Sequence, residues 1–142
     1  MIAVAHLTYP NYTEACYLTD TAYKPEGVSR DEAFALLDQL RDIGARSVLI
    51  TSIRVDRQTT VVGYNHHKNE YFILPYTEIP VHFPGTGDIF SAILVGNLLK
   101  GTPLRLSTRI AMDVVARLID LNKDNVDKNR GIPIENYLSD VL

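Results

Sequence analysis

Residues 82–91 have the sequence HFPGTGDIFS, in which two glycines flank a threonine and an aspartate follows directly. Glycine permits a tight backbone path, and the first N–H groups of a helix have no partner inside it, so such a loop can turn several donors toward an anion. The stretch therefore predicts an anion-binding helix N-terminus with the carboxylate of Asp88 beside it. A bound phosphate next to a base favours phosphoryl transfer. An ordinary turn, with Asp88 complementing the helix dipole, accounts for the four residues about equally well.

An apolar pattern at helical spacing continues through residues 89–99. Nearly every face of this helix is apolar, which predicts a buried helix rather than a surface one. Burial would hold its N-terminus at a fixed point, as a catalytic anion site requires.

Upstream of this motif the sequence predicts alternating strands and helices. Residues 2–8 form an expected buried strand, and residues 11–19 an expected helix with Asn11 and Glu14 as a reciprocal capping pair. A second capping box, Ser29 with Glu32, opens a helix that ends at Gly44 and whose expected apolar face is Ala33, Leu36, Leu37, Leu40 and Ile43. Residues 47–53 are a continuous apolar run, typical of a strand in a parallel sheet.

Two further strands, residues 59–64 and 71–76, are expected to form a hairpin through a polar loop. After the motif helix, Thr102 and Pro103 predict the start of another helix. Its expected buried face is Ser107, Ile110, Ala111, Val114, Leu118 and Leu121. A polar linker over residues 122–130 and a short helix over residues 133–142 complete the prediction of one domain, residues 1–142.

Composition excludes several classes of protein. The chain has 142 residues, 46% of them hydrophobic, and a formal net charge of -3, which describes a globular protein without the basic patch that nucleic acid requires. The single cysteine, Cys16, excludes an internal disulfide framework and favours a reducing compartment. The apolar opening segment is too short to span a membrane and lacks the basic flank of a signal peptide. We therefore expect no nucleic-acid or membrane partner and a cytoplasmic location.

Three motifs resemble the ribokinase-like superfamily, and within it the vitamin B6 (pyridoxal, pyridoxine, pyridoxamine) kinases. They are the GTGD loop of residues 85–88 followed by Ile-Phe, the PNYTEA segment of residues 10–15, and the VLITS strand end of residues 48–52. The resemblance covers most of this chain but only the C-terminal half of such a kinase. It implies a partial α/β fold, the C-terminal portion of a Rossmann-like three-layer α/β/α sandwich. We expect a fragment or a truncated gene product, because the chain begins inside an expected core strand.

The resemblance also implies roles for individual residues. The N–H groups of Gly85, Thr86 and Gly87 would form the anion hole, and Asp88 would accept the proton of the substrate hydroxymethyl group. Thr51 and Ser52 would contact ATP phosphates, while Ile79 and Phe83 would line the adenine slot. Glu14, with Asn11, would help to hold Mg²⁺, although the same two residues suit a plain helix cap. Tyr9 departs from the threonine that usually precedes Pro-Asn, which puts one nucleotide contact in doubt.

The implied reaction is ATP-dependent phosphorylation of the 5′-hydroxymethyl group of a B6 vitamer, with a missing N-terminal half supplying the vitamer pocket. Hydroxymethylpyrimidine (phosphate) kinase is the alternative within the superfamily; its loop more often has cysteine at the position of Asp88. A non-catalytic nucleotide-binding fragment is the alternative from another class. A half-sheet has an open edge, so we also expect a homo-oligomer or association through that edge.

Overall fold

The computed structural model describes residues 3–4, 7–77 and 85–122 of the chain. The chain divides into two compact units, Met1–Thr77 and Glu78–Leu142, and each is described by itself. The expectation of a single domain over residues 1–142 therefore stays a prediction.

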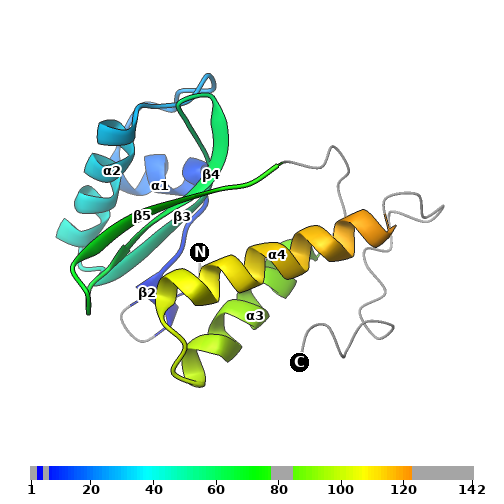
Figure 1. Cartoon of the computed structure of the whole chain (residues 1–142). Coiled ribbons are helices and arrows are strands. Elements are labelled where there is room, and N and C mark those ends of the chain that lie inside the picture. The colour runs from blue at the N-terminus through cyan, green and yellow to red at the C-terminus, as the bar shows by residue number, and fades with distance from the viewer. Residues whose placement is uncertain (1–2, 5–6, 78–84, 123–142) are drawn as a thin grey trace. The chain divides into compact units, whose positions relative to one another are not determined.

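The first unit contains a five-stranded sheet with the strand order β1-β2-β3-β4-β5 (Figure 1). Its strands are β1 (Ala3–Val4), β2 (Leu7–Thr8), β3 (Ser47–Val55), β4 (Gln58–Asn65) and β5 (Glu70–Pro75). β2 and β3 are parallel, and every other neighbouring pair is antiparallel. This mixed α/β architecture confirms the predicted fold class.

One predicted strand is wrong. Residues 2–8 do not form a single strand, because β1 and β2 pair antiparallel to each other, with Val4 opposite Leu7. The sequence between Val4 and Leu7 contains no glycine, proline or asparagine, so the apolar pattern of residues 2–8 predicts one continuous strand. The predicted hairpin, in contrast, is confirmed as β4 and β5, in register from Thr60 opposite Pro75 to Asn65 opposite Glu70.

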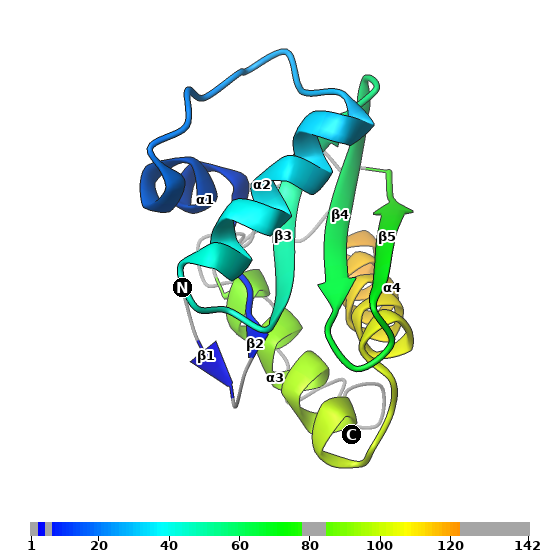
Figure 2. The same cartoon turned by 90° about the vertical axis from the view of Figure 1, so that its left-hand side faces the viewer.

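Two helices, α1 (Tyr12–Thr19) and α2 (Arg30–Asp42), connect the parallel strands β2 and β3 and lie on the same face of the sheet (Figures 1 and 2). Both capping boxes are confirmed. Asn11 and Glu14 cap α1 and Ser29 and Glu32 cap α2, each pair through reciprocal side chain to backbone hydrogen bonds. Gly44 follows α2 with φ of 128°, a left-handed conformation that glycine adopts without penalty.

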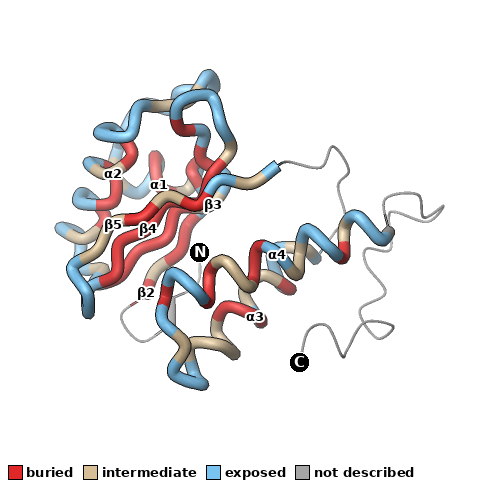
Figure 3. Tube along the Cα trace, in the orientation of Figure 1, coloured by how far each residue is buried: buried red, intermediate tan, exposed pale blue. Residues whose placement is uncertain are grey.

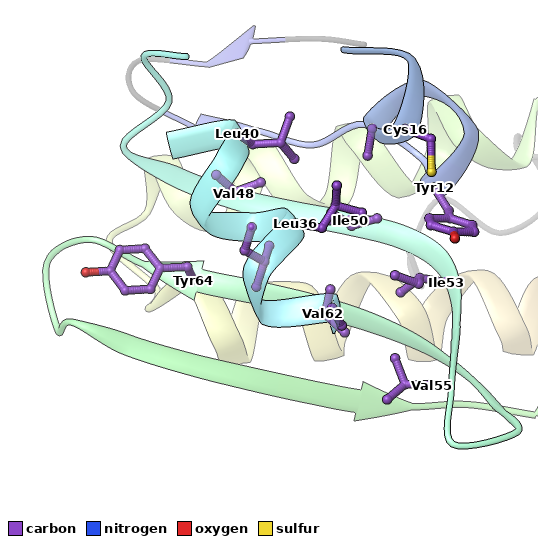
Figure 4. Packing of buried hydrophobic residues seen from close by; sticks show 13 residues of the cluster. Tyr12, Cys16, Leu36, Leu40, Val48, Ile50, Ile53, Val55, Val62 and Tyr64 are labelled. Carbon is purple, nitrogen blue, oxygen red and sulfur yellow. The ribbon is translucent and has the colours of Figure 1, made fainter. Parts of the chain in front are cut away.

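The core of this unit lies between the two helices and the sheet, where the buried positions of each helix face the strands (Figure 3). Figure 4 shows the side chains of α1, α2, β3 and β4 that meet there. Cys16 is buried in this cluster, and so are four of the five apolar residues expected on α2: Ala33, Leu36, Leu37 and Leu40. Ile43 is an exception, with 62% of its surface exposed, because it lies past the end of α2 at the C-cap.

The second unit contains two helices packed on each other, α3 (Thr86–Leu99) and α4 (Leu104–Asn122). Both predicted helices are confirmed, but their buried faces differ from expectation. Leu99 is 79% exposed and Leu121 is 53% exposed, each in the last turn of its helix. Periodicity identifies an apolar face but not how far a neighbouring element extends along it. The polar linker and the C-terminal helix were predicted for residues 122–130 and 133–142. Asn122 is instead the last residue of α4, and the rest lies outside the described residues.

Among the helices that the structure describes, none has both the length and the apolarity to cross a membrane.

Candidate active site

The first group of predicted site residues lies where β2 and β3 run side by side. The chain leaves β2, passes Tyr9 and Pro10, and enters α1 at Asn11. The backbone N–H of Thr51 donates to the Pro10 carbonyl at 3.0 Å, and Asn11 and Thr51 form an isolated parallel bridge. Two segments about forty positions apart in the sequence are thereby joined at the carboxyl end of a parallel strand pair, the edge at which open α/β sheets bind ligands.

Asn11 and Glu14 hold each other in place at this edge. The Glu14 N–H donates to Asn11 Oδ1 at 2.8 Å, and the Asn11 N–H donates to Glu14 Oε1 at 3.0 Å. Asn11 is exposed and Glu14 is half-buried. A carboxylate has about four acceptor positions on its two oxygens, so the capping bond and a metal contact are compatible.

The donor set fits Mg²⁺ better than a metal that needs a full protein cage. In the described ranges, no group of three or more His, Cys, Asp or Glu side chains gathers as a metal site. One carboxylate and one amide oxygen remain as candidates, and Mg²⁺ prefers oxygen ligands while keeping several of its waters.

Thr51 and Ser52 occupy an irregularity in β3. The register between β3 and β4 shifts between Ile50 and Ile53, and Ser52 has φ of 59°, in the left-handed region. Thr51 is half-buried and Ser52 is exposed. Bulges redirect side chains and occur often beside active sites, so this one places two hydroxyl residues next to Asn11 in a conformation that a regular strand does not offer.

The second group lies at the N-terminus of α3 in the other unit. Gly85 is the N-cap, with φ of 89° and no side-chain capping bond, and the first helical hydrogen bond runs from the Ile89 N–H to the Gly85 carbonyl at 3.1 Å. Within the described part of the chain, no acceptor meets the N–H groups of Thr86, Gly87 and Asp88.

None of the described residues fills the space beside Gly85 and Gly87. A side-chain carbon built on either glycine would meet no described atom within 4 Å, and Gly85, Gly87 and Asp88 are all exposed. Unpaired N–H donors at the positive end of a helix dipole, without a side chain over them, fit a phosphate group. Asp88 is placed beside such a group by its position in the first turn.

The structure thus brings Asn11, Glu14, Thr51 and Ser52 together in one unit and Gly85, Thr86, Gly87 and Asp88 together in the other. Ile79 and Phe83, the predicted adenine contacts, lie outside the described residues. The functional roles of all ten residues stay predictions. Sequence reasoning also passed over a feature of Tyr9: its hydroxyl is buried without a hydrogen-bond partner among the described residues. In the sequence, the one indication that this side chain is buried is its position directly after an expected apolar strand.

The sheet with its polar residues around Asn11 and Thr51, and the glycine loop at the start of α3, are features of a Rossmann-like α/β protein of the ribokinase-like type. The chain belongs to the phosphomethylpyrimidine kinase family, whose sequence profile matches residues 1–133.

Three relatives illustrate the relationship. Pyridoxal kinase of Arabidopsis thaliana is 33% identical over 124 residues, and pyridoxal kinase of Dictyostelium discoideum is 27% identical over 131 residues. The alignments cover 79% and 84% of this chain but only 38% and 42% of the two relatives. A candidate phosphomethylpyrimidine kinase of Bacteroides thetaiotaomicron, solved in a crystal form with pyridoxal, superposes with a TM-score of 0.85 at 33% identity. That match covers 96% of this chain and 49% of the other. The predicted resemblance to pyridoxal kinases is confirmed, and the chain spans less than half the length of each of these relatives.

Proposed function

We propose that this chain is the nucleotide-binding and catalytic part of an enzyme that transfers the γ-phosphoryl group of ATP to the 5′-hydroxymethyl group of pyridoxal, pyridoxine or pyridoxamine. The observation that carries this proposal is the N-terminus of α3, where no acceptor among the described residues meets the N–H groups of Thr86, Gly87 and Asp88 and where the carboxylate of Asp88 is exposed. Membership of the kinase family and the pyridoxal kinases among the relatives support it.

In this proposal the residues of α3 act on the reacting groups. The N–H groups of Gly85, Thr86 and Gly87 bind the phosphoryl oxygens, because aimed donors stabilise developing negative charge without reorganising. Asp88 accepts the proton of the substrate hydroxymethyl group, and its place in the first turn of α3 puts it beside the bound phosphate.

The residues of the first unit bind and orient the nucleotide. Thr51 and Ser52 donate hydroxyl hydrogen bonds to phosphate oxygens, while Glu14 and Asn11 hold Mg²⁺, commonly through water. Bound MgATP supplies the phosphoryl group and a metal that neutralises its negative charge. Ile79 and Phe83 remain the proposed adenine contacts.

Phosphorylation of hydroxymethylpyrimidine, or of its phosphate, is the second candidate reaction. The description of the matching family favours it, since the family is defined by phosphomethylpyrimidine kinase. Asp88 at the fourth position of the loop favours the B6 vitamers. Because the chain spans 38–42% of its curated relatives, a third possibility is a non-catalytic fragment that binds nucleotide only.

We also propose that the protein associates with a second chain through its sheet and acts in the cytoplasm. β1 and β5 end the order of the described strands, so each is an outer strand to which a further strand could pair. A complementing half of the fold, or a second copy, would occupy such an edge. Free, buried Cys16 agrees with a reducing compartment.

Coupled ATP turnover separates these possibilities. The chain is assayed alone and after mixing with the remaining part of the Arabidopsis relative, with pyridoxal or hydroxymethylpyrimidine as acceptor. We expect turnover with pyridoxal that Asp88→Asn lowers about 10²–10⁴-fold. The free energy of unfolding should fall by only about 0.3–1 kcal/mol, because exposed Asp88 loses no more than its favourable charge in the first turn of α3. Turnover that survives Asp88→Asn contradicts the assigned base. Saturable ATP binding without turnover under every condition identifies the non-catalytic fragment.

A further inference from the structure

The hydroxyl of Tyr9 has an unusual position. The side chain is 7% exposed, and its oxygen is the buried side-chain polar atom for which the described residues provide no hydrogen-bond partner. Buried polar groups in proteins are nearly always paired, because an unpaired one has lost its water without compensation. An exception therefore calls for an explanation such as a bound partner.

The other buried hydroxyls show that this fold otherwise satisfies such groups. Thr60 Oγ1 donates to the Ile53 carbonyl at 2.9 Å, Thr108 Oγ1 donates to the Leu104 carbonyl at 2.8 Å, and the Tyr64 hydroxyl donates to Asn69 Oδ1 at 2.6 Å. Tyr9 differs from them in its location. It directly precedes Pro10 and Asn11, the residues that pair with Thr51 where β2 ends beside β3.

We propose that the Tyr9 hydroxyl donates a hydrogen bond to an oxygen of the nucleotide's phosphate chain, so that the ligand supplies an acceptor that the described residues do not provide. This inference rests on the proposed function and adds a positioning residue to it. Ionised phosphate oxygens accept hydrogen bonds and have no proton to donate, which suits a phenol O–H, and a hydrogen bond to an ionised acceptor is stronger than a neutral one. The neighbouring Asn11 and Thr51 belong to the proposed phosphate and metal contacts.

The substitution Tyr9→Phe removes only the hydroxyl, and Tyr64→Phe is the matched control because it removes a buried hydroxyl that is already paired. Calorimetry measures the affinity of the full chain for MgATP, inorganic triphosphate and adenosine, and thermal unfolding without ligand measures stability. For Tyr9→Phe we expect Kd for MgATP and triphosphate to rise about tenfold or more, with adenosine unaffected. Its melting temperature should stay equal or rise, because an unpaired polar atom is removed. Tyr64→Phe should lower the melting temperature and leave every Kd unchanged.

Three results would overturn the inference. The first is a Tyr9→Phe variant that binds triphosphate as tightly as the parent chain. The second is a loss of adenosine affinity alone, which places the acceptor on the nucleoside. The third is a melting temperature lowered as much as in Tyr64→Phe, which shows that the hydroxyl is paired in the free protein. If the unmodified chain binds neither MgATP nor triphosphate, the proposed function fails as well. If the parent chain and Tyr9→Phe bind MgATP and triphosphate equally well, only the proposed Tyr9 contact is wrong and the proposed function stands.

Discussion

Glu14 has two assigned tasks, and a single substitution separates them. Its carboxylate accepts the Asn11 N–H at 3.0 Å as part of the cap of α1, and we propose that it also holds Mg²⁺. Glutamine serves the same position in a capping box, because its amide oxygen accepts the same hydrogen bond. Glu14→Gln therefore keeps the cap and removes the charge, whereas Glu14→Ala removes both.

The structure sets the expected change in unfolding free energy and in Mg²⁺ requirement for each variant. Glu14→Gln loses a favourable charge at the first turn of α1, about 0.3–1 kcal/mol of unfolding free energy. Glu14→Ala loses in addition the hydrogen bond to the Asn11 N–H, a further loss of about 0.5–1.5 kcal/mol. The two variants should differ in stability but not in their Mg²⁺ requirement. Because both lack the carboxylate, both should need about 10–100-fold more Mg²⁺ for half-maximal ATP binding.

The assay combines urea unfolding with calorimetric ATP titrations at several Mg²⁺ concentrations. The control is Glu32→Gln, the same exchange in the second capping box, where Glu32 accepts the Ser29 N–H at 3.2 Å. This control should leave the Mg²⁺ requirement unchanged. If Glu14→Gln shows the Mg²⁺ dependence of the parent chain while Glu14→Ala loses stability, Glu14 is a helix cap and the metal role is wrong.

Three glycine substitutions test the backbone of the fold and of the site. Gly85→Ala should lower the unfolding free energy by about 1–2 kcal/mol, because φ of 89° is strained for alanine even where its side chain meets no atom. Gly87→Ala should instead raise the unfolding free energy by roughly 0.5–1 kcal/mol, since alanine favours the helix that begins at Thr86. Urea unfolding measures both variants, and the argument is wrong if both substitutions raise or both lower the unfolding free energy. Gly63→Ala should lower the unfolding free energy by about 1–3 kcal/mol through overpacking, because its new side-chain carbon would overlap the ring of Phe72. A Gly63→Ala chain as stable as the parent would show that the ring moves aside freely.

The local elements of this protein follow from the sequence by itself. The boundaries of α1 and α2 were predictable because each start carries a reciprocal capping pair, Asn11 with Glu14 and Ser29 with Glu32, whose partners are three positions apart. The start of α3 at the glycine loop and the hairpin of β4 and β5 also follow from neighbouring residues. Such signals need no knowledge of distant contacts.

Only the tertiary structure decided how these pieces meet. The bridge between Asn11 and Thr51, the register shift beside Ser52 and the antiparallel pairing of β1 with β2 all depend on partners chosen through space. The exposure of Leu99 could not be predicted from the sequence for the same reason, since an apolar pattern identifies a helix face but not the element that covers it. The unpaired hydroxyl of Tyr9 is likewise invisible in the sequence, because whether a buried polar atom finds a partner depends on every residue packed around it.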